Sequence, residues 1–230
     1  MTIEERLEET ERKIRDACVK SGRKREDVKL IAVTKTRTPE EINTAIRWGI
    51  TDIGENRVQE LTEKYEVLLP CKKHLIGQLQ TNKVKYILEK VEMIHSLDRA
   101  ALAEQIEKLA QKNNLAPVKT LIEINIGHED TKSGILPENL SEHLDIFQNF
   151  RYIKVMGLMT VAPANANEEE QERYFETMRE LLVRAQAVFG PECRELSMGM
   201  SRDYEAAIRQ GSTMIRLGSA IFGERNYNIT

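Results

Sequence analysis

The chain has 230 residues, of which 40% are hydrophobic and 31% charged, and its 34 basic and 37 acidic residues give a net charge of -3. This balance argues against a nucleic-acid-binding protein, which needs a basic surface, and against a polyanionic tail. No apolar run approaches the ~18 residues of a membrane span, and the acidic first segment lacks the apolar core of a signal peptide. Three scattered cysteines without a Cys-x-x-Cys pair predict a cytoplasmic protein without a zinc ribbon or disulfide scaffold.

The first predicted element is a helix over residues 2–21, where Thr2 and Glu5 match a capping box and Gly22 marks the end. After it, short apolar runs alternate with amphipathic segments. Strands are expected at 30–33, 51–54, 74–77, 92–95, 119–126, 152–159, 194–198 and 213–217. A second helix opens at Thr38-Pro39, and further helices are expected at 57–68, 82–90, 99–113, 138–148, 168–188 and 203–210.

Eight apolar strands that alternate with helices indicate parallel βαβ units. In a chain of 230 residues this count favours an α/β fold with one domain over 1–230, a closed (β/α)8 TIM barrel with an extra N-terminal helix. An open, doubly wound sheet is the alternative that periodicity leaves open. In a barrel, the functional residues follow the C-terminal ends of the strands.

Lys35 follows the first strand and shares the parity of Ile31 and Val33, which predicts that it points into the barrel mouth. Partial burial lowers the pKa of a lysine, and a neutral amine attacks an aldehyde or ketone. The plainer interpretation is a solvated lysine at the barrel rim.

Two Gly/Ser segments follow strands seven and eight. Ser201 is expected to cap the helix at 203–210, and Gly218-Ser219 to open a short last helix through Phe222. Many barrels bind phosphate with the loops after these two strands. Ordinary capping and tight turns are the alternative interpretation.

Arg216 interrupts an otherwise apolar strand. A buried guanidinium must be paired or face a ligand, so it either pairs with Glu55 or Glu123 or contacts a bound molecule. A lysine for an aldehyde, donors for a phosphate and an arginine together fit pyridoxal 5′-phosphate. The same groups also fit a Schiff-base aldolase.

At these positions the sequence resembles the pyridoxal phosphate homeostasis proteins, a family similar to the N-terminal barrel of alanine racemase (a fold type III pyridoxal phosphate protein). The resemblance runs from about residue 29 to 225. Its motifs are AVTK (32–35), GENRVQE (54–60), HLIGQLQTNK (74–83), HSLD (95–98), INIGHEDTKSG (124–134), GLMTVAP (157–163), LSMGMS (196–201) and GSTMIRLGSAIFGER (211–225).

The resemblance implies a role for each cofactor-binding residue. Lys35 would hold pyridoxal phosphate as an aldimine, Arg216 would face the pyridine nitrogen, and Asn56 would lie beside the ring. The phosphate would be surrounded by Ser197, Ser201, Gly218 and Ser219, the last of which stands where threonine is common.

The resemblance also implies a protein of vitamin B6 homeostasis that binds the cofactor without efficient catalysis. Racemisation needs an acid/base group on each face of the cofactor, and alanine racemase takes its second group, a tyrosine, from a partner subunit. None of the six tyrosines here obviously ends a strand, and the chain has no room for the racemase's second domain, which predicts a monomer. Apo forms of pyridoxal phosphate-dependent enzymes are the expected partners. A weak racemase and a Schiff-base aldolase acting on a phosphorylated carbonyl remain the alternatives.

The histidines and two lysines after the third strand are further candidates for binding sites. The four histidines lack metal-ligand spacing, so no metal site is predicted. Lys83 and Lys85 follow the third strand and either hold a second, non-covalent cofactor molecule or form a solvated face.

Overall fold

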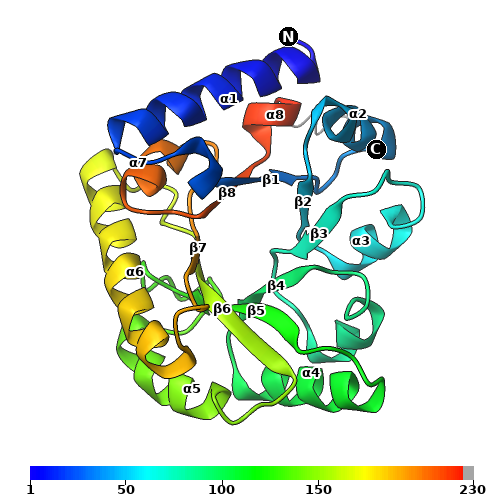
Figure 1. Cartoon of the computed structure of the whole chain (residues 1–230), viewed down its shortest axis with the longest axis vertical. Coiled ribbons are helices and arrows are strands. Elements are labelled where there is room, and N and C mark those ends of the chain that lie inside the picture. Colours follow the sequence, from blue (N-terminus) through cyan, green and yellow to red (C-terminus); the bar gives the residue numbers. More distant parts are fainter. Residues whose placement is uncertain (225–230) are drawn as a thin grey trace.

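The computed structural model describes residues 1–224 and shows a closed barrel of eight parallel strands in the order β1 to β8 (Figure 1). β1 closes the barrel by pairing with β8. The predicted barrel is therefore confirmed, and the open sheet is excluded. The strands are β1 (Lys29–Val33), β2 (Asp52–Glu55), β3 (Lys72–Leu75), β4 (Met93–Leu97), β5 (Val118–Ile124), β6 (Ile153–Thr160), β7 (Glu195–Ser197) and β8 (Met214–Leu217).

Helices surround the barrel on its outside (Figure 1). The predicted extra helix, α1 (Ile3–Lys20), packs against α2, α7 and α8. No helix within residues 1–224 is both long and apolar enough to cross a membrane. The other helices are α2 (Pro39–Trp48), α3 (Val58–Lys64), α4 (Ala100–Lys112), α5 (Leu140–Phe147), α6 (Glu168–Phe189), α7 (Tyr204–Arg209) and α8 (Ser219–Phe222), with short 3-10 helices at Arg25–Asp27, Thr81–Tyr86 and Pro137–Asn139.

Capping boxes set the first residues of α1, α2 and α6. Thr2 accepts a hydrogen bond from the backbone N–H of Glu5, and the Glu5 carboxylate accepts the N–H of Thr2. Thr38 and Glu41 repeat this arrangement at the start of α2. Each cap stabilises its helix by roughly 1 kcal/mol and fixes where the preceding loop ends.

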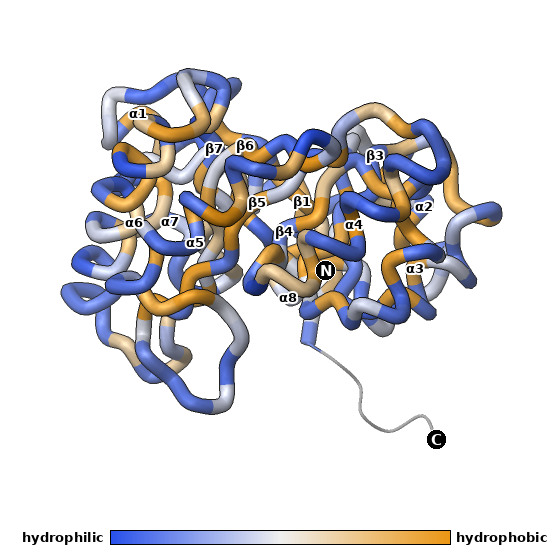
Figure 2. Tube along the Cα trace, turned by 90° about the horizontal axis from the view of Figure 1, so that it is seen from below, coloured by the Kyte–Doolittle hydropathy of each residue, from blue (hydrophilic) through white to orange (hydrophobic). Residues whose placement is uncertain are grey.

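The apolar core has two layers. Side chains of five strands close the middle of the barrel, namely Ile31, Met93, Leu121, Met159 and Met214. A larger layer lies between the strands and the helices, and hydrophobic residues recur along the elements that enclose it (Figure 2). Because the middle of the barrel is filled, a site must lie at the strand ends.

Three predicted elements differ most clearly from the structure. The helix expected at 57–68 ends at Lys64, and the third strand covers Lys72–Leu75 rather than 74–77. The segment 82–90 contains the 3-10 helix Thr81–Tyr86 in place of an α-helix. Val84 is the one buried residue of this 3-10 helix, and the buried Ile87 and Leu88 follow after the helix has ended.

Candidate functional site

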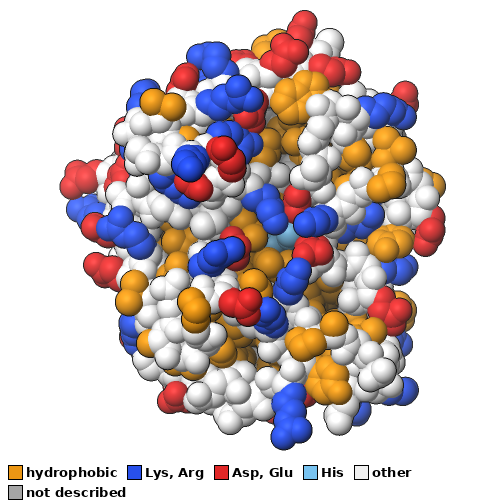
Figure 3. Space-filling model, viewed as in Figure 1, with side chains coloured by type: hydrophobic (Ala, Val, Ile, Leu, Met, Phe, Trp, Pro, Cys, Tyr) orange, Lys and Arg blue, Asp and Glu red, His pale blue; other side chains and the backbone are white. Residues whose placement is uncertain are grey.

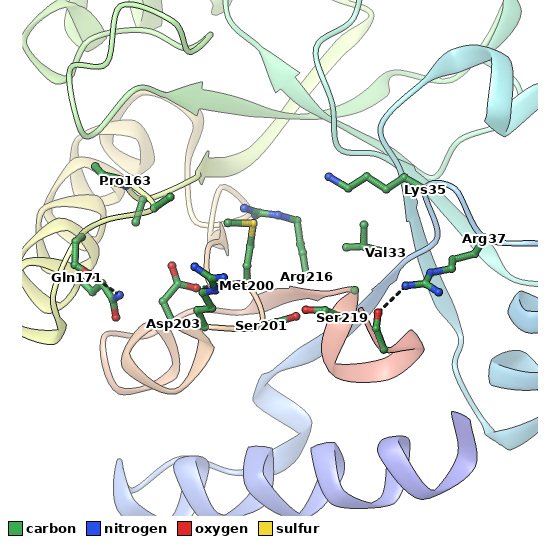
Figure 4. Close-up of a pocket in the computed structure, with 16 residues that line it drawn as sticks. Val33, Lys35, Arg37, Pro163, Gln171, Met200, Ser201, Asp203, Arg216 and Ser219 are labelled. Carbon is green, nitrogen blue, oxygen red and sulfur yellow. Dashed lines mark hydrogen bonds between the residues drawn. The ribbon is translucent and has the colours of Figure 1, made fainter. Parts of the chain in front are cut away.

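A cavity of about 500 Å³ opens at the C-terminal ends of the strands (Figure 4). The loops after β1, β6, β7 and β8 supply its walls, together with Arg216 on β8 itself. Its lining residues include Val33, Lys35, Met200, Ser201, Asp203, Arg216, Gly218 and Ser219. Five of the seven predicted binding residues therefore meet in one cavity.

Lys35 is half-buried, and its amine extends into the cavity toward the guanidinium of Arg216 (Figure 4). The next residue, Thr36, has a φ of 64°, a left-handed conformation that is rare for a β-branched residue. The Glu60 carboxylate accepts the Thr36 backbone N–H at 2.7 Å and so compensates for this conformation. The turn that follows β1 therefore holds the lysine in a defined direction.

A buried ion-pair network supports the same turn from β2 and α3. Lys64 Nζ donates to the Thr34 carbonyl at 3.0 Å, to Glu55 Oε1 at 2.8 Å and to Glu60 Oε2 at 3.0 Å. Thr34 Oγ1 also donates to Glu55 Oε1, at 2.8 Å. Burial raises the pKa of Glu55 in spite of its bonds to Lys64 and Thr34. Glu55 thus pairs with Lys64 and not with Arg216, the partner considered from the sequence.

Arg216 lies on β8 with 3% of its surface exposed. Its Nη1 donates to Ser197 Oγ at 2.5 Å and its Nη2 to the Thr160 carbonyl at 2.7 Å. Burial lowers its pKa to about 10, against the favourable fields of Asp203 and Glu123, so the side chain is a cation at neutral pH. Its hydrogen bonds to described residues go to neutral oxygens, and the predicted direct pair with Glu123 does not form.

The two Gly/Ser segments meet at the cavity wall. Ser201 Oγ accepts the backbone N–H of Ala220 at 3.3 Å and so joins the loop after β7 to α8. The predicted last helix, α8, begins after Gly218 as expected. Ser201, however, does not cap α7: the N-cap is Asp203, whose carboxylate accepts the Met200 N–H at 2.5 Å. Ser201 instead lines the cavity.

Ser197 and Asn56 are not among the residues that line this cavity. Ser197 is fully buried, because strand β7 turns its side chain into the barrel below Arg216. Asn56 lies in a second cavity with Gln78 and Lys83, and its buried Oδ1 has no hydrogen-bond partner within the described part of the chain. Lys85 is exposed, so only the first of the two lysines considered for a second site faces a cavity.

Arg37 and Asp203 are among the cavity residues that the sequence did not indicate. Arg37 donates to the Gly223 carbonyl at 2.6 Å and stacks its guanidinium 5.6 Å from the centre of the Phe222 ring, which connects the Lys35 turn to α8. Asp203 is buried, and burial raises its pKa. Arg37 stands two residues after Lys35, and Asp203 stands two residues after Ser201. Their closeness to predicted site residues is the sequence signal that could have identified them.

Glu123 on β5 supplies a test of the electrostatics near Arg216. Its Oε1 accepts from Ser133 Oγ at 2.9 Å, its buried Oε2 has no partner among residues 1–224, and burial raises its pKa to about 7 from 4.5. Between pH 4.5 and pH 7 the folded state binds more protons than the unfolded state. The free energy of unfolding therefore falls as the pH rises, and above pH 7 the loss reaches about 3 kcal/mol.

We therefore expect Glu123→Gln to stabilise the ligand-free protein at pH 8 and to have almost no effect at pH 4.5, measured by urea unfolding. Glu92→Gln is the control, because the ion pair of Glu92 with Lys119 outweighs burial and lowers the pKa of Glu92. That variant should gain no stability at pH 8. An equal gain for Glu123→Gln at both pH values would contradict the assignment.

The sequence matches known proteins over almost its full length. Residues 7–226 match the family described as alanine racemase, N-terminal domain. A relative from Aquifex aeolicus (strain VF5), named pyridoxal phosphate homeostasis protein, is 46% identical over 225 residues, which are 97% of this chain and 98% of the relative.

Two solved structures show how the barrel relates to known folds. PipY of Synechococcus elongatus PCC7942, solved with PLP bound, has 31% identity and a TM-score of 0.82, over 96% of this chain and 100% of PipY. Alanine racemase from Corynebacterium glutamicum has 15% identity and a TM-score of 0.70, over 96% of this chain and 62% of that enzyme. At that identity the racemase shows the shared fold alone.

Proposed function

Since the chain belongs to the family of the pyridoxal phosphate homeostasis proteins, we propose that it binds pyridoxal 5′-phosphate in the cavity at the barrel mouth, as a reversible aldimine with Lys35. One observation carries the proposal: a half-buried lysine amine and a buried arginine share a cavity with two serine hydroxyls. These groups match the aldehyde, the ring nitrogen and the phosphate of one molecule.

The ring and its nitrogen find suitable neighbours in the cavity. Val33 beside Lys35 and Met200 beside Arg216 offer apolar contact surface (Figure 4). Arg216 uses one N–H of each Nη group for Ser197 and Thr160, which leaves further N–H donors of its guanidinium for a ring nitrogen. As a cation it disfavours protonation of that nitrogen, so the ring is a weaker electron sink than one held by a carboxylate.

The phosphate would lie between the two Gly/Ser segments. Ser201 and Ser219 supply hydroxyl donors, and Gly218 between β8 and α8 allows close approach of the backbone. Ser197 would act indirectly, through Arg216, and Asn56 from the neighbouring cavity.

We infer binding without efficient catalysis. No tyrosine within residues 1–224 lines the cavity, and the sixth tyrosine, Tyr227, lies outside the described residues. The proposed role is to hold a reactive aldehyde and pass it to apo-enzymes. We place this role in a monomer of the cytoplasm, as one domain over 1–230, where the three cysteines remain free thiols.

The test compares cofactor delivery from the loaded protein with delivery from free pyridoxal phosphate. An apo-aminotransferase receives each source in the presence of a phosphatase that destroys free cofactor. We expect the loaded protein to restore activity where the free cofactor does not. Equal reactivation from both sources would contradict transfer.

The same preparation separates the alternatives. Sustained conversion of L-alanine to D-alanine by the loaded protein would favour a weak racemase. Cleavage of a phosphorylated carbonyl compound by the cofactor-free protein would favour a Schiff-base aldolase.

A further inference from the structure

A chain of polar side chains, joined by one ion pair and then by hydrogen bonds, crosses the barrel interior and ends at the buried arginine of the cavity. Its members stand on six strands and share the inward parity of Ile31, Met93 and Met214, which fill the barrel. In order they are Lys29, Asp52, His74, His95, Ser197 and Arg216, referred to here as the polar chain.

The polar chain begins at the end of the barrel opposite the cavity. The strands follow one another clockwise in Figure 1, and because βαβ crossovers are right-handed, this view faces the ends at which the strands begin. Lys and Arg side chains gather with Asp and Glu side chains around the barrel axis on this face (Figure 3). Lys29 and Asp52 are the first residues of β1 and β2, so they belong to this end.

The lower half of the polar chain is a carboxylate with its partners. Asp52 Oδ1 lies 3.5 Å from Lys29 Nζ and 2.8 Å from His74 Nε2, and Thr51 donates to Oδ2 at 2.7 Å. His74 Nδ1 lies 3.0 Å from His95 Nε2, with the two rings nearly perpendicular. Both histidines are fully buried. Two imidazoles thus link the carboxylate to the upper half.

The upper half reaches the arginine through one hydroxyl. His95 Nδ1 lies 3.0 Å from Ser197 Oγ, which accepts from Arg216 Nη1 at 2.5 Å. Because arginine only donates hydrogen bonds, the serine oxygen must present a lone pair to it. The serine proton is then available to His95.

The charge states of Asp52 and His95 limit which atoms of the polar chain donate hydrogen bonds and which accept them. Burial raises the pKa of Asp52, but hydrogen bonds from His74 and Thr51 outweigh it and hold the pKa at about 2, so a carboxylate accepts from His74 Nε2–H. Burial, with the neighbouring His74 and Arg216, holds the pKa of His95 well below its usual range. A neutral His95 carries one ring proton, and a proton on Nε2 lets His95 donate to His74 Nδ1 and accept at Nδ1 from the Ser197 hydroxyl.

In the opposite arrangement His74 donates to His95 and His95 donates to Ser197, and fewer hydrogen-bonding groups then have a partner. It needs a doubly protonated His74, and it makes Ser197 Oγ accept from both His95 and Arg216, which leaves the serine proton without an acceptor in the polar chain. A buried donor without a partner costs about 1–3 kcal/mol. The first direction leaves no such donor.

We propose that Asp52, His74 and His95 are positioning residues for Arg216, because they orient the Ser197 hydroxyl so that its oxygen holds the guanidinium toward the cofactor cavity. This inference rests on the proposed function, because the orientation of Arg216 matters only if the cofactor lies against it. Hydrogen bonds in such a series polarise one another, so a change at Asp52 reaches Arg216 across the whole barrel.

The first test needs no cofactor. Nuclear magnetic resonance of isotope-labelled histidine nitrogens in the ligand-free protein distinguishes the two neutral tautomers from the imidazolium. The signals of His128, which is exposed, and of His143, which is half-buried on α5, are identified by replacing each with alanine. We expect His74 and His95 both to carry their proton on Nε2. A proton on Nδ1 of His95, or an imidazolium at His74, would overturn the proposal.

The second test measures cofactor affinity in a double-mutant cycle. Asp52→Asn removes the charge and should weaken pyridoxal phosphate binding by about tenfold, the worth of a hydrogen bond to a charged group. In a Ser197→Ala background, which cuts the polar chain, the same substitution should have almost no effect. Glu92→Gln removes a carboxylate from the same end of the barrel outside the polar chain and should change affinity by less than about twofold.

The two tests separate this inference from the proposed function. An equal effect of Asp52→Asn with and without Ser197 would overturn the positioning role while leaving cofactor binding intact. If the wild-type protein takes up no pyridoxal phosphate, the proposed function fails. The histidine tautomers, and their response to Asp52→Asn, then still decide whether the polar chain orients Arg216.

Discussion

Replacement of Lys35 by alanine is expected to abolish covalent capture of pyridoxal phosphate. The Lys35 amine is half-buried and extends into the cavity beside Arg216, whereas a solvated surface lysine meets the aldehyde only by collision. The amine would condense with the aldehyde and release water. Borohydride then reduces the carbon–nitrogen double bond to a stable amine, which intact-mass measurement detects as one added group per chain.

The matched control is Lys83→Ala, which removes a lysine from the neighbouring cavity lined by Asn56. This variant should capture the cofactor as the wild type does. Equal labelling of the Lys35 variant, or loss of labelling in the Lys83 variant, would contradict the assignment of Lys35. The second result would point to the cavity beside Asn56.

A negative charge at Ser201 is expected to produce the second large effect. Ser201 is half-buried, lines the cavity and contacts α8 through the Ala220 N–H. Two like charges about 4 Å apart near a protein surface repel by about 4 kcal/mol. Ser201→Asp should therefore lower the affinity for pyridoxal phosphate by at least about 100-fold, as measured by titration of the visible absorbance.

Pyridoxal, which lacks the phosphate, is the control ligand for this prediction. Its affinity should be almost unchanged by Ser201→Asp. Ser141→Asp adds the same charge on α5, on the outside of the barrel, and should leave both affinities unchanged. If pyridoxal and pyridoxal phosphate lose equal affinity in Ser201→Asp, the variant has altered the cavity and the phosphate does not lie at this residue.

Most of the fold was predictable because each strand is a short apolar run with a turn after it. Leu30–Val33 and 213–217 were placed within one residue of β1 and β8. The segment 82–90 was less predictable, since its buried residues Val84, Ile87 and Leu88 have the i, i+3, i+4 spacing of an α-helix, yet the structure forms a 3-10 helix at Thr81–Tyr86. Packing in the closed barrel overrides this local pattern.

The site was predictable where a residue directly follows a strand. Lys35, Gly218 and Ser219 meet at the cavity by this rule. Ser197 was expected beside the phosphate, but it is the last residue of β7 and faces the barrel interior. Its direction depends on the register of β7 against β6 and β8, and a shift of one residue reverses it.

The polar chain was not predictable from spacing in the sequence. His74 and His95 stand 21 residues apart on separate elements, so the sequence shows neither metal-ligand spacing nor a contact between them. Closure of the barrel brings β3 and β4 side by side and turns both rings inward. Within residues 1–224 no cluster of three or more metal-ligating side chains forms. Their hydrogen bonds to Asp52 and Ser197 exist only once the barrel has closed.

The visible spectrum of the wild-type protein with pyridoxal phosphate, recorded before and after borohydride and followed by peptide mapping, tests the central claim most directly. We predict an aldimine band that disappears on reduction, with the added group on the peptide that contains Lys35. A protein that develops no band, or that carries the group on another lysine, would contradict the assignment of the cavity as a pyridoxal phosphate site.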